Sequence, residues 1–163
     1  HRQGRRGAGT DRKEREAMSV KTYTSHELRQ LIKEDSPQVE IGTSLNADGK
    51  YVMATRESWE SDILPAFKLW MIDNDMWNWK DKHDCDDKAD ALKLFAQRCF
   101  QETSHKVAAD GFAVWRVWYT RHDGGGHAIN RALTDEGFIY IEPQTAKVVK
   151  LTKKEEASKW LEY

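Results

Sequence analysis

The sequence predicts an α+β fold in which helices precede an antiparallel sheet. Between residues 56 and 100, apolar residues recur every three or four positions, as on one face of a helix. Between residues 112 and 151, short segments rich in aromatic and β-branched residues alternate with turn residues, as in a β-meander. Helices followed by strands are typical of α+β proteins. With no internal repeat and no second apolar core, we expect residues 18–163 to form one domain.

Composition narrows the choice of partners. The chain has 163 residues, of which 33% are charged, and its formal net charge is −1. This length is sufficient for one buried core, and the near-neutral charge indicates neither a nucleic-acid nor an acidic-lipid partner. Most of the seven tryptophans must be buried, since an exposed cluster of that size promotes aggregation. No apolar run approaches the roughly 18 residues needed to span a bilayer, so we expect no membrane partner.

Residues 1–17 form a distinct N-terminal segment. They are polar, rich in arginine and lysine, and contain three glycines without apolar periodicity. We expect a disordered leader or an expression tag, with Met18 as the natural start. We interpret its basic residues as a solvated tail and not as a nucleic-acid patch.

The two cysteines, Cys85 and Cys99, lie 14 positions apart on one predicted helix. That spacing separates them by about 21 Å along the helix axis, which is too far for a disulfide. Free thiols fit a reducing compartment, and the sequence shows no secretory signal pattern. We therefore favour a cytoplasmic location.

The first half of the chain contains two helical segments and two strands. Thr24-Ser25-His26-Glu27 can form a capping box that opens a helix, and this helix should end before Pro37. Further segments follow in order: a strand at 39–45, a turn at 46–49, a strand at 50–55 and a helix at 56–73. In the last of these, Pro65 should either kink the helix or split it in two.

The central helix begins near Cys85. Its apolar face comprises Ala89, Leu92, Phe95, Ala96, Cys99 and Phe100. Projecting this face back four residues from Ala89 reaches Cys85, so we expect the thiol to point inward or along a cleft. His83 or Asp84 can cap the helix, and Asp86 and Asp87 fill its first turn, where negative charge is favourable.

The second half of the chain reads as a meander followed by a helix. The expected strands are residues 112–120, 127–133, 138–142 and 148–151. Pro143 ends the third strand, since proline is confined to strand edges and ends. The glycine-rich segment 121–126 lacks the strand-to-helix setting of a phosphate-binding loop. Thr152 and Glu155 form a second capping box, which opens a last helix carrying Ala157, Trp160 and Leu161.

Strand register brings a histidine and a glutamate together. If the turn at 134–137 closes with Leu133 opposite Phe138, paired residue numbers sum to 271, and Ile129 faces Glu142. His127 and Glu142 then lie on the same face as diagonal neighbours, within reach of a hydrogen bond. A slip of one residue would place them on opposite faces.

Cys85, His127 and Glu142 supply a nucleophile, a base and a group that orients the base. The N-terminus of a helix and a protonated histidine both stabilise a thiolate. The carboxylates of Asp84, Asp86, Asp87 and Asp90 act in the opposite direction and raise the pKa of the thiol. Either the thiol is inert or a cation offsets these charges. A non-enzymatic binding module, with a structural Cys85 and an aromatic recognition surface, therefore stays open as an alternative.

The motifs that carry these residues resemble a known family. Gly126-His127-Ala128-Ile129-Asn130, Ile141-Glu142-Pro143-Gln144-Thr145 and Cys85-Asp86-Asp87 resemble the C-terminal cysteine-protease domain of fungal chimeric lectins of the mushroom agglutinin type. This domain belongs to the papain- and transglutaminase-like superfamily. The interval from Cys85 to His127 (127 − 85 = 42) suits the family, and the similarity covers residues 77–145. A β-trefoil lectin domain is not recognisable in this sequence.

The resemblance implies a papain-like cysteine protease with a Cys-His-Glu triad, a peptide or protein substrate and a requirement for calcium. Asp84, Asp86 and Asp87, with Asp81 nearby, are oxygen ligands of the kind that Ca²⁺ prefers; a solvated acidic helix start is the alternative. Papain-type enzymes often carry a glutamine shortly before the cysteine, and here Asn78 is the expected substitute as an oxyanion donor. Peptidoglycan amide cleavage or transglutamination would use the same residues.

Overall fold

A computed structural model describes residues 21–43, 49–78 and 84–163 of the chain. Its helices are α1 (Ser25–Asp35), α2 (Arg56–Ser58), α3 (Leu64–Asp73), α4 (Cys85–Gln101) and α5 (Lys153–Ala157), with a π-helical turn at Trp59–Ile63 and a 3₁₀ turn at Ser104–Val107. Its strands are β1 (Thr22–Thr24), β2 (Glu40–Ile41), β3 (Lys50–Val52), β4 (Gly111–Phe112), β5 (Val114–Thr120), β6 (Gly126–Thr134), β7 (Gly137–Glu142), β8 (Lys147–Val149) and β9 (Leu161–Glu162). The predicted leader, residues 1–17, lies outside the described part.

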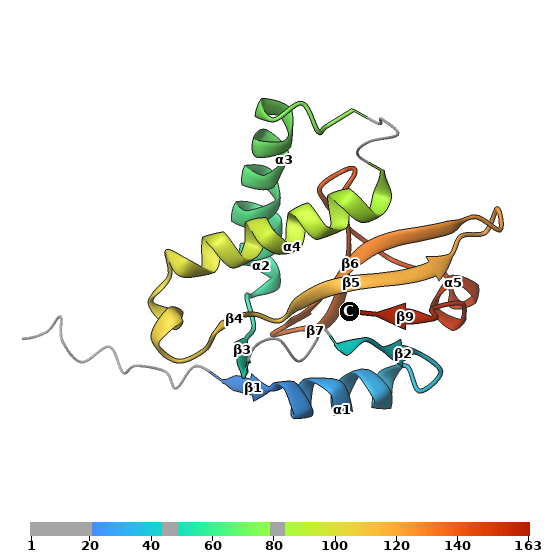
Figure 1. Cartoon of the computed structure of the whole chain (residues 1–163), viewed down its shortest axis with the longest axis horizontal. Helices are drawn as coiled ribbons and strands as arrows, with labels where there is room; N and C mark the ends of the chain where they lie inside the picture. Colours follow the sequence, from blue (N-terminus) through green and yellow to red (C-terminus); the bar gives the residue numbers. More distant parts are fainter. Residues whose placement is uncertain (1–20, 44–48, 79–83) are drawn as a thin grey trace, which may run out of the picture.

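The predicted α+β class is confirmed. A sheet with strand order β2-β9-β5-β6-β7-β8 carries helix α4 across strands β5 and β6, and helix α1 lies on the opposite side (Figure 1). Strands β5 to β8 form the antiparallel meander. A smaller sheet, β1-β3-β4, extends the structure beside it. Among the described helices, none has the length and apolar character needed to cross a membrane.

The main core lies between the sheet and the helices on the α4 side. It contains Leu92, Ala96 and Phe100 of α4, and on the sheet Val114, Ala132 and Ile141. Helix α4 starts at Cys85, and Ala89, Leu92, Ala96 and Phe100 are buried as its spacing predicts. Its length therefore follows from a continuous apolar face packed on the sheet.

The helical stretch predicted at 56–73 is present without a break, as α2, the π-helical turn and α3. Pro65 lies in the first turn of α3, where its missing N–H costs nothing. The backbone before it widens into the π-helical turn, so the segment passes the proline with a local change in winding. Trp59, Ile63, Phe67 and Met71 stay on the buried side throughout.

The ends of the sheet differ from the sequence prediction. The strand expected at 39–45 is limited to Glu40 and Ile41 among the described residues, and the one expected at 50–55 ends at Val52. The predicted last helix stops at Ala157, where Ser158 Oγ donates to the carbonyls of Glu155 and Thr120. Leu161 and Glu162 then form β9, which pairs with β5 and β2. The helical prediction for Trp160 and Leu161 was therefore wrong, because sheet pairing outweighs local preference.

On the face of the sheet opposite α4, a network of buried charged side chains holds β9 in place. Arg131 Nη1 lies 2.6 Å from Glu162 Oε1, and both residues are buried. Trp115 Nε1 donates to Glu162 Oε2 at 2.6 Å, and Arg131 Nη2 bonds Asp35 of α1. These contacts join the C-terminal strand, the sheet and the first helix.

Glu162→Gln should destabilise the fold by about 3 kcal/mol, because it leaves the buried guanidinium of Arg131 without its main counter-charge. Urea unfolding followed by tryptophan fluorescence measures this change. Glu136→Gln is the matched control, since Glu136 forms an exposed pair with Arg56 and should unfold at the wild-type urea concentration. Equal unfolding midpoints for the two variants would contradict the role of Glu162.

Candidate active site

Cys85 is the first residue of α4. Asp84 precedes it in an extended conformation at the cap position, without a side-chain bond to the helix. Asn130 Nδ2 of β6 donates to the Ala89 carbonyl at 2.8 Å, which fixes the first turns of α4 against the sheet. The half-buried thiol of Cys85 therefore faces strand β6.

The sheet leaves one backbone donor of β6 for this thiol. Strand β7 pairs with β6 only as far as Asn130, whereas β5 pairs with it as far as Gly126. The N–H of Leu133 points toward β5, where it bonds Ala113, so by alternation the N–H of Ala128 points to the β7 side. No β7 residue pairs with Ala128, and its backbone N–H lies where it lowers the pKa of the Cys85 thiol.

His127 and Glu142 meet as the strand register predicts. Leu133 lies opposite Phe138, and His127 Nε2 is 2.7 Å from Glu142 Oε2. Glu142 Oε1 also accepts the N–H of Gln144 at 3.0 Å, so two bonds orient the carboxylate. Since Nε2 faces Glu142, Nδ1 is the ring nitrogen left for the interaction of His127 with Cys85. The predicted register and the predicted His127–Glu142 hydrogen bond are both confirmed.

The site favours a thiolate next to an imidazolium. Burial opposes the charge on Cys85, but the bond to His127, the Ala128 N–H and the charge of His127 together lower the pKa of the thiol. Burial likewise opposes the charge on His127, yet its bonds to Cys85 and Glu142 raise its pKa to about 9. The thiolate forms above the lowered pKa of Cys85, and the imidazolium is lost as pH rises through 9. The ion pair is therefore confined to the pH interval between the lowered pKa of Cys85 and the raised pKa of His127.

An arginine offsets part of the acidic charge around the helix start. Arg116 Nη1 of β5 lies 2.8 Å from Asp90 Oδ2 and 3.7 Å from Asp86 Oδ2. Its guanidinium is buried and lies over the ring of Tyr163, 4.2 Å from its centroid. The sequence predicted that a reactive thiol needs a cation nearby, and Arg116 supplies one within the chain. In the sheet, Arg116 lies opposite Asn130, whose side chain bonds α4. This pairing places Arg116 on the α4 side, which the sequence alone did not reveal.

The predicted metal ligands are only partly assembled. Asp84 and Asp86 approach each other, since a hydrogen bond between them, together with burial, raises the pKa of Asp86. Asp87 is exposed, and Asp81 lies outside the described residues. Within the described part of the chain, no three His, Cys, Asp or Glu side chains are arranged to hold a metal ion.

Asn78, the predicted oxyanion donor, is exposed at the end of the segment that follows α3. Its carbonyl lies 3.5 Å from Nζ of Lys88, and the carbonyl of Trp77 lies 3.1 Å from the same atom. Sequence reasoning missed Lys88. The available signal was its spacing, since it is three residues after Cys85 and next to Ala89 on the inner face of α4.

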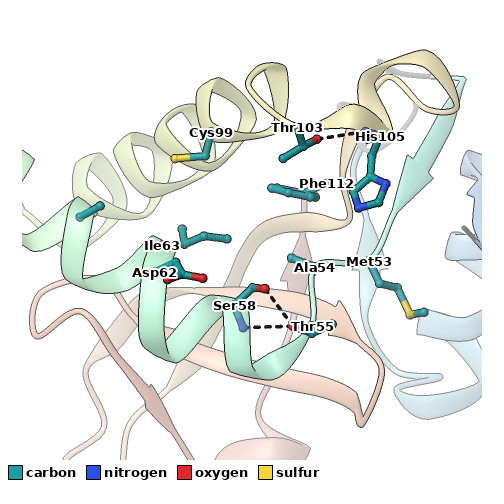
Figure 2. Close-up of a pocket in the computed structure, with 11 residues that line it drawn as sticks. Met53, Ala54, Thr55, Ser58, Asp62, Ile63, Cys99, Thr103, His105 and Phe112 are labelled. Atoms are coloured by element: carbon teal, nitrogen blue, oxygen red, sulfur yellow. Dashed lines mark hydrogen bonds between the residues drawn. The ribbon is translucent and has the colours of Figure 1, made fainter. Parts of the chain in front are cut away.

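Cys99 lies near the other end of α4, apart from the candidate triad. It lines a cavity of about 400 Å³. Figure 2 shows it there with Phe112, Ile63 and Asp62. Burial, with a smaller contribution from Glu102, raises the pKa of this thiol. Cys99 therefore serves as an internal control for the chemistry of Cys85.

The fold resembles solved structures of a fungal lectin. The complex of PSL1a with E64, a cysteine protease inhibitor, matches with a TM-score of 0.61 and 17% identity over 86% of this chain and 49% of that chain. Polyporus squamosus lectin bound to the epitope Neu5Aca2-6Galb1-4GlcNAc matches with a TM-score of 0.61, 18% identity and the same coverage. This chain thus spans about half the length of those proteins. No protein-family model and no curated protein matches the sequence.

His127→Ala should slow the reaction of Cys85 with iodoacetamide at pH 7 by at least about tenfold. A rise of about one unit in the pKa of the thiol lowers the fraction of thiolate by that factor. The substitution removes the bond and the charge that lower the pKa of Cys85, and leaves burial and Asp84, which raise it. Mass spectrometry of the labelled peptides across a pH series measures both cysteines at once. Cys99 should label slowly in both proteins, and equal labelling of Cys85 and Cys99 in the wild type would exclude an activated Cys85.

Proposed function

We propose that the chain is a papain-like cysteine hydrolase that cleaves peptide bonds. The contact of Cys85 with His127, which Glu142 orients, carries this proposal. The likeness of the fold to a protein solved with E64 supports it.

The reaction begins with the thiolate of Cys85 attacking the carbonyl carbon of the substrate amide. The backbone N–H of Cys85, at the start of α4, and the side-chain amide of Asn78 are the proposed donors to the oxyanion. The imidazolium of His127 gives its proton to the leaving nitrogen as the C–N bond breaks, which leaves a thioester on Cys85 and a neutral imidazole. His127 then removes a proton from water, the resulting hydroxide attacks the thioester, and the acid product departs. The thiolate and imidazolium are restored.

The acyl acceptor and the substrate distinguish a protease from the two alternative activities. An amine in place of water would make the protein a transglutaminase-like transferase, and a peptidoglycan amide would make it an amidase. Incubation of the protein with a peptide library or with peptidoglycan, each with and without an added primary amine, followed by mass spectrometry, separates the three activities. New peptide termini support the protease; amine-modified glutamines with no cleavage would overturn it.

Glu142→Gln should lower kcat by about 10²–10⁴-fold, because the neutral amide no longer orients or charges the imidazole. The bond and charge of Glu142 help to raise the pKa of His127 to about 9. The falling limb of the pH profile should therefore shift to lower pH in the variant. Glu136→Gln, in the turn of the same hairpin, is the control and should keep the wild-type profile. An unchanged limb in Glu142→Gln would remove Glu142 from the triad.

We further propose that Asp84, Asp86 and Asp87 bind Ca²⁺. Asp84 Oδ1 is buried without a hydrogen-bond partner among the described residues, and Asp86 lies beside it. Two adjacent carboxylates fit a hard divalent cation, which would neutralise charge next to Cys85.

Millimolar Ca²⁺ should raise the melting temperature of the wild type by several degrees, since an ion that binds only the folded state stabilises it. Asp84→Asn should abolish this shift. Differential scanning fluorimetry with Ca²⁺, Mg²⁺ and a chelator provides the measurement. A wild-type melting temperature that does not change with Ca²⁺ would remove the metal from the proposed function.

A further inference from the structure

Lys88 is a buried ammonium three residues after the candidate nucleophile. Its side chain is 1% exposed, on the inner face of α4 beside Ala89. Its Nζ donates to the Trp77 carbonyl at 3.1 Å and approaches the Asn78 carbonyl at 3.5 Å. Among the described residues, it forms no ion pair with a carboxylate. Two carbonyl oxygens are therefore its partners in the described structure.

This arrangement is costly for a residue that only fills space. Burial lowers the pKa of Lys88, and the charge of Glu142 partly restores it. A buried ammonium loses hydration that two carbonyl contacts only partly replace. Methionine or leucine would fill the same inner position of α4 without this cost. What lysine adds is a donor that reaches from α4 to the backbone of another segment.

That segment connects α3 with the candidate site. Met76 N–H bonds the Met71 carbonyl at 2.8 Å, which anchors the beginning of the segment on α3. Trp77 packs against the main core, and Lys68 Nζ lies 5.0 Å from the centroid of its ring. At the end of its described part, the backbone carbonyls of Trp77 and Asn78 lie within reach of Lys88 Nζ. Lys88 thus links the position of Trp77 and Asn78 to the helix that begins with Cys85.

We infer that Lys88 is a positioning residue, which holds the backbone of Trp77 and Asn78 so that the Asn78 amide faces the oxyanion formed at Cys85. The inference rests on the proposed function, because it assigns Lys88 a part in acylation. Lys88 touches neither the substrate nor the reacting atoms; it acts through the carbonyls of the segment. Misplacing a donor by about 1 Å is enough to slow such a step by about a hundredfold.

The test separates thiolate reactivity from acylation. Alkylation by iodoacetamide needs a thiolate but no oxyanion donor, whereas acylation by a peptide ester or amide needs both. Lys88→Met should therefore alkylate Cys85 at the wild-type rate within about twofold and acylate at least about tenfold more slowly. Lys88→Arg keeps a charged donor and should recover most of the acylation rate. Lys93→Met removes a charge from the same helix and should behave as the wild type.

A double-mutant cycle then tests the path of the effect. Asn78→Ala should show the same split between alkylation and acylation, and adding Lys88→Met to it should cost little more. Asn78 is exposed, so this variant also tests the inference if Lys88→Met does not fold.

Each result decides a different question. Wild-type protein that alkylates but does not acylate would overturn the proposed function and the inference with it. Acylation at the wild-type rate in Lys88→Met would overturn the inference and leave the proposed function standing. The same result in Asn78→Ala would overturn the inference and remove Asn78 as an oxyanion donor, but leave the proposed Cys85–His127–Glu142 chemistry standing. Loss of alkylation in folded Lys88→Met would show that Lys88 supports the triad itself, which also contradicts the inference.

Discussion

The candidate site depends on the point at which β7 stops pairing with β6. Strand β6 continues four residues beyond its last pair with β7, from Asn130 to Gly126, while β5 stays bonded to it. The N–H of Ala128 then has no strand carbonyl to bond, and an unpaired buried donor is unfavourable. Cys85 lies at this point, where the Ala128 backbone lowers the pKa of its thiol. One break in the sheet therefore gives the start of α4 a place to dock and gives the thiolate a donor.

The same register brings together the base and its orienting group. Alternation puts His127 and Glu142 on one face only because Leu133 lies opposite Phe138. The left-handed conformation of Gly137 (φ 97°) in the connecting turn suits glycine and fixes this pairing. A turn longer or shorter by one residue would place His127 and Glu142 on opposite faces of the sheet, although both residues would still be present in the sequence. The hairpin turn is thus as important to the proposed chemistry as the residues that carry it.

Charge is distributed on both faces of the sheet. On the α4 side, Arg116 lies beside Asp90 and Asp86, and Lys88 holds the segment before the site. On the other side, Arg131 binds Glu162 and Asp35. Buried ion pairs add little net stability compared with apolar packing, but they require fixed partners. Both networks therefore favour one arrangement of the helices and β9 around the sheet.

The sequence predicted those parts that local pattern determines. The α+β class, the start of α4 at Cys85, both capping boxes and the register of the central hairpin were visible as spacing and turn chemistry. The parts it missed are set by distant partners. Strand β9 forms because β5 and β2 offer free edges. The ion pairs of Arg116 were hidden because its partners, Asp86 and Asp90, lie on a helix distant in the sequence. The spacing of Lys88 placed it on the inner face of α4, but its carbonyl partners could not be inferred from that spacing.

Comparison of the two cysteines shows why sequence alone leaves reactivity open. Cys85 and Cys99 lie on the same helix and are both half-buried free thiols. Burial raises the pKa of each, yet the pKa of Cys85 falls below its ordinary value and that of Cys99 rises above it. Burial therefore cannot be the deciding cause. The difference comes from the partners: Cys85 meets an imidazole and a backbone N–H, whereas Cys99, near the other end of α4, meets the charge of Glu102. The pKa of this helix thiol is lowered by the strand that reaches it, and His127 on that strand is 42 residues away (127 − 85 = 42) in this chain.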